Sequence, residues 1–181
     1  MYFTLQARIM EFNLGETATN MARLEAGFIM PGLEFNEALK TINYKYDQTP
    51  FELSLDWLVD FEKPHFNGRS ALLKERDKGS EYRLVKLDIE GNKPAEESHL
   101  YADEKCTVEI GYVTSAMWSP VVKSNIALAM IENQYLGGSI LAEIYYGKEL
   151  RHHSKVVNCR VQTTPFWAPE RARLTPPPKI K

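Results

Sequence analysis

Residues 82–89, Tyr-Arg-Leu-Val-Lys-Leu-Asp-Ile, decide the fold of the second half of the chain, because their polar and apolar side chains alternate as in a strand with one buried face. The same alternation recurs in residues 107–113, 140–145 and 156–161. Glycine clusters such as Gly137-Gly138 separate these segments and are typical of tight turns. Several strands joined by short turns, with no long helix among them, predict a small antiparallel β-barrel.

The residues before Gly79 mix helical and strand signals. Residues 1–14 place apolar side chains at helical spacing, and Gly15 is expected to end that helix. Polar and apolar residues alternate in residues 22–29 and again in residues 57–61, which predicts two strands.

Two short helices are also predicted in this first part. Thr49-Pro50 reads as a helix start, with Thr49 as the cap and Pro50 in the first turn, and this helix should reach about Ser54. A second helix should run from Ser70 to Lys78. The predicted fold class is therefore α+β: a mixed α/β region at residues 1–79, then the barrel at residues 80–166.

The last residues, 167–181, form a proline-rich tail. Prolines occur from Pro165 onward and end in the run Pro176-Pro-Pro178, which cannot extend a sheet. The tail is expected to be either a strap across the fold or a loose end.

Composition excludes several classes of function. The 181 residues include 22 lysines and arginines against 24 acidic residues, so no excess of positive charge is available to bind nucleic acid. The longest apolar stretches fall far short of the roughly 20 residues that cross a bilayer, so no membrane span is expected. The N-terminal residues lack a basic head followed by an apolar run, so no secretory signal is expected either. We therefore expect a cytoplasmic protein.

No self-contained catalytic or metal-binding motif occurs in the sequence. Glycine-rich phosphate loops, a Gly-x-Ser-x-Gly elbow and a His-Glu-x-x-His segment are all absent. His152 and His153 are adjacent, so on a strand they would point to opposite faces and would not share a metal ion. Cys106 and Cys159 lack zinc-ligand spacing and are expected to be reduced and mostly buried.

Glu25 is a candidate ligand-binding residue in the segment Arg23-Leu-Glu-Ala-Gly27. On a strand, Arg23 and Glu25 would share one face, with the apolar residues on the other. A carboxylate in that place could accept two N–H bonds from a flat heterocycle such as a pterin. The alternative, which the periodicity alone favours, is a structural ion pair with a nearby arginine or lysine.

Two further segments carry residues suited to binding. Aromatic and basic side chains lie close together at Trp57, Phe61, Lys63, His65 and Arg69, where they could stack on a ring and hold a carboxylate tail. The alternative is core packing beside a solvated basic turn. The hydroxyl-rich segment from Gly111 to Pro120 is expected to be structural, because short hydroxyl side chains stabilise turns by bonding to nearby backbone.

Taken in order, these segments resemble the C-terminal half of the glycine-cleavage T-protein family. The resemblance runs through Ala22-Arg-Leu-Glu-Ala-Gly27, Thr49-Pro-Phe-Glu52, Leu55-Asp-Trp57, Phe61-Glu-Lys-Pro-His-Phe-Asn-Gly-Arg69, Ala71-Leu72, Gly111-Tyr-Val-Thr-Ser115, Ser119-Pro120, Ile126-Ala-Leu-Ala129 and Pro165-Phe166. The resemblance implies a protein of three domains around a folate-binding channel, the last of them a small β-barrel. Residues 1–79 would then be the end of the central folate-binding domain.

The resemblance also implies a function, the transfer of a one-carbon unit to tetrahydrofolate. In the T-protein itself, an aminomethyltransferase, the donor is an aminomethyl group on the lipoyl arm of a carrier protein. Related demethylases use small methylated donors. By position, Glu25 would bind the pterin, and Lys63, Arg69 and Arg171 are the candidates for further folate contacts.

The family's catalytic aspartate lies in an N-terminal domain that this sequence does not match, so no residue here is assigned a catalytic role. We expect the chain to be a fragment of a longer protein, or else to obtain the missing part from another chain or a homodimer partner. Two other readings are a folate-binding relative in iron–sulfur cluster assembly and an isolated interaction module. The first is disfavoured because residues 63–69 lack its cysteine.

Overall fold

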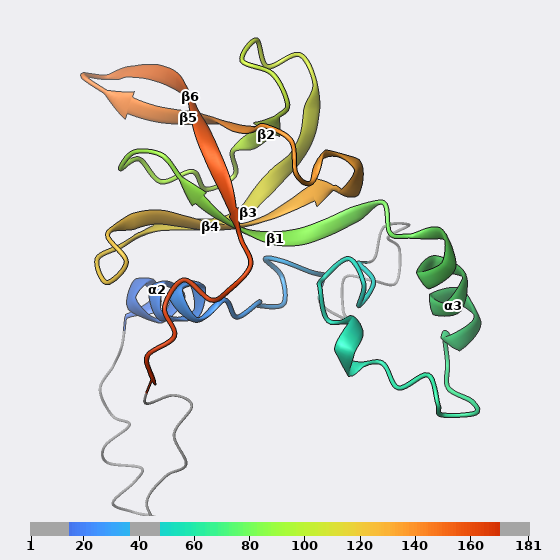
Figure 1. Cartoon of the computed structure of the whole chain (residues 1–181). Coiled ribbons are helices and arrows are strands. Elements are labelled where there is room, and N and C mark those ends of the chain that lie inside the picture. The colour runs from blue at the N-terminus through green and yellow to red at the C-terminus, as the bar shows by residue number, and fades with distance from the viewer. Residues whose placement is uncertain (1–14, 37–47, 171–181) are drawn as a thin grey trace, which may run out of the picture.

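A closed antiparallel β-barrel forms the second half of the protein. The computed structural model describes residues 15–36 and 48–170. The six barrel strands are β1 (Tyr82–Ile89), β2 (His99–Tyr101), β3 (Glu109–Ser119), β4 (Ser124–Glu132), β5 (Ile140–Lys148) and β6 (Arg151–Gln162). They follow the order β1-β4-β3-β2-β5-β6 around the barrel, and β6 pairs with β1 to close it. The predicted α+β class and antiparallel barrel are confirmed (Figure 1).

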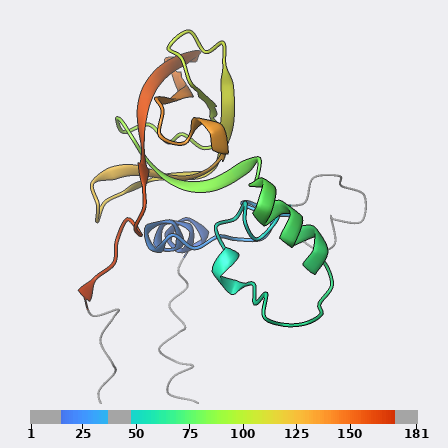
Figure 2. The ribbon, with the colours of Figure 1, turned by 45° about the vertical axis from the view of Figure 1, so that its right-hand side comes forward.

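Two helices accompany the barrel in the described residues. Helix α2 (Glu16–Ala26) lies across the outside of the barrel against β3 and β4. Helix α3 (Arg69–Lys78) leads directly into β1. Two short 3₁₀ helices are also present: η2 (Asp56–Leu58) precedes α3, and η3 (Asn133–Tyr135) follows β4. Figure 2 shows that α2 and α3 lie on the same side of the barrel, below β1 and β4. None of the helices described combines the length and apolar character needed to cross a membrane.

Strand β4 is buried on both faces, which explains why its sequence is a continuous apolar run. Ala127, Ala129 and Ile131 belong to the core inside the barrel. Their neighbours Ile126 and Leu128 belong to a second cluster outside it, together with Leu24 of α2. Alternation therefore could not reveal this strand, and it was not predicted. The three-residue strand β2 was missed as well, because it is too short to carry a pattern.

The strand predicted at residues 22–29 is wrong, because most of this segment is the end of α2. The helix is capped rather than continued as a strand: Gly27 adopts a left-handed conformation with φ 75°. The amide of Gly27 donates to the Leu24 carbonyl and that of Phe28 to the Arg23 carbonyl, which is a Schellman motif. Helix-forming residues such as Ala22 and Ala26 outweigh the short alternation. Gly15 is the N-cap of α2. The helix predicted at residues 1–14 lies outside the described residues.

The segment from Thr49 to Phe61 also differs from its prediction. Thr49 does act as a cap, since the Glu52 amide donates to its hydroxyl and its own amide donates to the Glu52 carboxylate. This reciprocal pair is a capping box. Only a turn follows it, because Ser54 has a positive φ of 57°, which a helix cannot accommodate. The strand predicted at residues 57–61 is instead η2 followed by a loop. The helix predicted at residues 70–78 is confirmed as α3.

The segment after β6 crosses α2, as Figure 1 shows. Phe166 packs against the cluster that contains Leu24, and the amide of Trp167 donates to the carbonyl of Glu25 at 3.0 Å. This part of the tail therefore straps α2 onto the barrel, which was one of the two expectations for it.

Both cysteines are free thiols of intermediate burial. Burial raises the pKa of the Cys159 thiol to about 12, so almost no reactive thiolate forms at neutral pH. We expect iodoacetamide at about pH 8 to leave Cys159 unmodified in the native protein and to alkylate it after unfolding in urea. Peptide mass spectrometry measures this. Rapid alkylation of native Cys159 would contradict the assigned burial.

Candidate functional site

Two serines on the outer face of β3 connect the barrel to α2. Ser115 and Ser119 are buried, and Met117 between them packs into the cluster that contains Leu24. Hydroxyls in such an apolar contact need partners. Each donates to a carboxylate outside the barrel, Ser115 to Glu34 and Ser119 to Glu25. These hydroxyls of the segment from Gly111 to Pro120 therefore bond to side chains far away in the sequence. The predicted stabilisation of a turn is seen at Ser119, whose Oγ also accepts a hydrogen bond from the Val122 amide.

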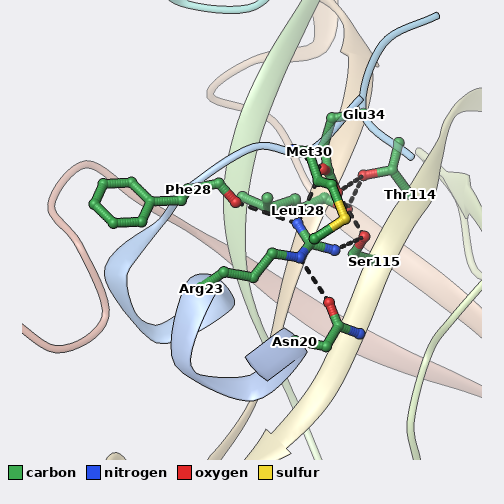
Figure 3. Close-up of polar contacts among 8 residues, drawn as sticks. All are labelled: Asn20, Arg23, Phe28, Met30, Glu34, Thr114, Ser115 and Leu128. Atoms are coloured by element: carbon green, nitrogen blue, oxygen red, sulfur yellow. Dashed lines mark hydrogen bonds and ion pairs between the residues drawn. The ribbon is translucent and has the colours of Figure 1, made fainter. Parts of the chain in front are cut away.

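The first of these carboxylates, that of Glu34, forms a buried ion pair with Arg23 (Figure 3). Arg23 Nη1 lies 2.9 Å from Glu34 Oε2. Arg23 also donates to Asn20 Oδ1, the Phe28 carbonyl and Ser115 Oγ. Glu34 also accepts hydrogen bonds from the Met30 amide, Ser115 Oγ and Thr114 Oγ1. Both oxygens of Glu34 are thus satisfied by protein donors. This network fixes the end of α2 to β3.

The second carboxylate, that of Glu25, has a different environment. Its side chain is buried and its Oε1 accepts the Ser119 hydroxyl at 2.5 Å. Among residues 15–36 and 48–170, Glu25 forms no ion pair. The predicted structural alternative was an ion pair of Glu25 with a nearby cation, but the nearby Arg23 pairs with Glu34 instead. On the helix, Arg23 and Glu25 do not share a face as they would on a strand.

Of the other residues predicted to contact a ligand, Lys63 and Arg69 lie before and at the start of α3, apart from α2 and Glu25. Lys63 is exposed in the loop before α3. The guanidinium of Arg69 donates to the backbone carbonyls of Lys63 and Phe61, so it holds this loop in shape. Arg171 lies outside the described residues. The roles assigned to these three residues remain predictions.

Phe61, one aromatic residue of the predicted binding cluster, packs against side chains outside that cluster. The Phe61 ring stacks on Phe51 at 6.1 Å and contacts Phe66, and the Arg76 guanidinium lies 5.0 Å from its centre. Trp57 takes no part in this packing and is 75% exposed. These contacts correspond to the structural interpretation of Phe61.

His152 and His153 lie on β6, and the His153 ring stacks on Tyr146 at 5.6 Å. Within the part of the chain described, no three His, Cys, Asp or Glu side chains gather as a metal site would require.

An open cleft of about 990 Å³ lies between α3 and the barrel, away from Glu25. Five glutamates line it: Glu52, Glu75, Glu81, Glu109 and Glu132. Burial raises the pKa of Glu52, and the charges of Glu75 and Glu81 add to the effect. Two lysines, Lys74 and Lys78, also line the cleft, but they do not outnumber the carboxylates, so this surface disfavours anionic ligands. Neither Glu25 nor Lys63 contributes to it.

The fold and these contacts define a six-stranded antiparallel barrel with a helix fixed to its outer face by a buried hydroxyl–carboxylate bond and by the ion-pair network of Arg23. The sequence of residues 83–167 matches the family model of the glycine cleavage T-protein C-terminal barrel domain. An aminomethyltransferase of Caldanaerobacter subterraneus subsp. tengcongensis is 37% identical over 121 residues, which are 67% of this chain and 29% of that protein. One from Thermosipho melanesiensis is 32% identical over 153 residues, 84% of this chain and 37% of that protein.

A solved structure shares the fold. The glycine cleavage system aminomethyltransferase T from Bartonella henselae superposes with a TM-score of 0.71 at 23% identity, over 91% of this chain and 43% of that one. The chain belongs to the glycine cleavage T-protein family and corresponds to its C-terminal portion. It spans between 29% and 37% of the length of these two curated relatives.

Proposed function

We propose that this chain provides the C-terminal portion of a tetrahydrofolate-dependent one-carbon transferase, in which Glu25 binds the pterin ring. The relatives it matches are aminomethyltransferases, so we propose an aminomethyl group as the donor rather than the methylated substrate of a demethylase. A lipoyl carrier protein would present that group. The transfer reaction is proposed for the complete family architecture, with residues 1–79 as part of the folate-binding domain and residues 80–166 as the barrel.

The observation that carries the proposal is the buried Glu25 carboxylate without a cationic partner in the described residues. Burying an ion is costly unless it is paired or well hydrogen-bonded. Glu34, which lies close by, is fully paired and therefore serves structure. Glu25 has acceptor capacity to spare, and the resemblance of the segment Arg23-Leu-Glu-Ala-Gly27 to the family implies that it is the pterin-binding residue.

The chemistry of this carboxylate fits a pterin. An ionised carboxylate offers about four lone-pair sites, and Ser119 donates to one of them. The edge of a pterin ring carries an amino group and a ring N–H, and a carboxylate can accept from both. Bound tetrahydrofolate would supply the nitrogen atoms that receive the one-carbon unit. Glu25 would hold and orient the ring, and the strap at Phe166 and Trp167 would limit access of water to it.

The test is isothermal titration of the chain with tetrahydrofolate, comparing the wild type with Glu25→Ala. We expect Glu25→Ala to weaken binding at least about tenfold, because hydrogen bonds to charged groups contribute about 1.5–3 kcal/mol. Glu25→Gln should lie between the two, since it keeps one acceptor and loses the charge.

Glu16→Ala is the matched control, because Glu16 is an exposed glutamate on the same helix. It should bind as the wild type does. Equal affinity in wild type and Glu25→Ala would exclude Glu25 as the pterin ligand. If tetrahydrofolate does not bind to the wild-type chain, the alternative interpretation, an isolated interaction module without a complete folate site, would be favoured instead.

A further inference from the structure

The hydroxyl of Ser119 is placed to control the orientation of the Glu25 carboxylate. Ser119 ends β3 and is completely buried, and its Oγ lies 2.5 Å from Glu25 Oε1 across 94 positions of sequence. The same oxygen accepts the amide of Val122 at 3.1 Å, in the turn that leads to β4. Because a hydroxyl has a single proton and its oxygen is already anchored by that amide, the proton is directed to Glu25.

We infer that Ser119 is a positioning residue for ligand binding by Glu25; this inference rests on the proposed function. Its bond restricts rotation of the carboxylate and engages Oε1, which leaves Oε2 facing the ligand. None of the described residues donates a hydrogen bond to Oε2.

The neighbouring serine provides the contrast that separates positioning from structure. Ser115 donates to Glu34 at the same distance of 2.5 Å, and it lies on the same strand. The Glu34 carboxylate, however, also accepts from Arg23 and the Met30 amide, so none of its oxygens is left for a ligand. Loss of either hydroxyl should lower the stability of the protein, but only loss of the Ser119 hydroxyl should weaken ligand binding.

The experiment compares Ser119→Ala with Ser115→Ala in the whole chain, by titration with tetrahydrofolate and with 6-methyltetrahydropterin, which lacks the aminobenzoylglutamate tail. We expect Ser119→Ala to weaken both ligands by the same factor, about threefold to tenfold, since one hydrogen bond no longer orients the carboxylate. Ser115→Ala should keep wild-type affinity for both. In a Glu25→Ala background, Ser119→Ala should cause no further loss, because the two residues act through one bond.

The outcomes separate this inference from the proposed function. If Glu25→Ala weakens binding and Ser119→Ala does not, the positioning role is wrong and the proposed function stands. If neither variant changes the affinity, both are wrong. Equal losses in Ser119→Ala and Ser115→Ala would mean that the two hydroxyls only stabilise the contact between α2 and β3.

A second variant covers the case in which Ser119→Ala does not fold. Ser119→Cys keeps the shape of the side chain, with a somewhat larger atom, and replaces the hydroxyl with a weak donor. A crystal structure of whichever variant folds should then have Glu25 in more than one side-chain orientation. A single, unchanged orientation would overturn the inference without any ligand being needed.

Discussion

Glu34→Ala is expected to destabilise the protein by about 3–5 kcal/mol, the cost typical of removing one partner from a buried ion pair. The side chain of Glu34 is 0% exposed and that of Arg23 is 7% exposed, so neither charge can turn to water when the other is removed. The variant would leave the Arg23 guanidinium with only neutral acceptors, among them Asn20 and Ser115. Domains are usually stable by only about 5–15 kcal/mol, so this loss would take away a large fraction of the total.

Urea unfolding followed by circular dichroism measures this loss. The double variant Arg23→Ala, Glu34→Ala should be less destabilised than the sum of the two single variants, because it leaves no unpaired charge. Lys148→Ala is the control, since Lys148 belongs to an exposed ion pair with Glu149. It should unfold at nearly the wild-type urea concentration. Strictly additive losses in the double variant would contradict the importance of the pairing.

The barrel could be predicted from sequence because most of its strands have one face toward the core and one toward water. Residues 82–89 alternate for this reason, and β1 has the predicted bounds. The same reasoning fails for β4, which is covered by α2 on its outer face and so carries no alternation. Its apolar run was visible, but a short apolar run alone does not distinguish a strand from a buried helix.

The error at residues 22–29 has a related physical cause. A short helix that packs against a barrel buries only some of its positions, and over eight residues these can imitate the alternation of a strand. The signal that would have settled the question was Gly27 after a run of helix formers, which is typical of a helix end. Glu25 was a candidate for chemistry in either case, because its residue type and its resemblance to the family do not depend on the element that carries it.

The partners of Glu25 could not be derived from sequence spacing. Ser119 is 94 positions away and Glu34 meets Ser115 across 81, and both contacts depend on how α2 lies on the barrel. Propensities describe neighbours along the chain and contain no information on such a docking angle. The sequence could indicate that the hydroxyls between Gly111 and Pro120 needed partners, but local rules directed them to their own backbone.

Gly111→Ala is expected to destabilise the barrel by about 3 kcal/mol, toward the upper end of the range typical of overpacking. Gly111 of β3 lies opposite Ile131 of β4. A β-carbon added to Gly111 would lie 2.1 Å from the Met130 carbonyl oxygen and 2.9 Å from the Ile131 α-carbon. Both are backbone atoms of a strand packed on its two faces, so neither can move aside without disrupting the pairing of β3 and β4.

Gly147→Ala is the matched control for this variant, because Gly147 lies near the end of β5 and an added β-carbon there meets no atom within 4 Å. It should be neutral or slightly stabilising, since glycine loses more conformational freedom than alanine when it enters a strand. Thermal unfolding of the two variants tests the difference, and similar melting temperatures would refute the close approach at Gly111. Strand β3 also carries Ser115 and Ser119, so a shift of this strand at Gly111 should loosen their hydrogen bonds to Glu34 and Glu25. If Glu25 binds the pterin, Gly111→Ala should therefore weaken tetrahydrofolate binding as well.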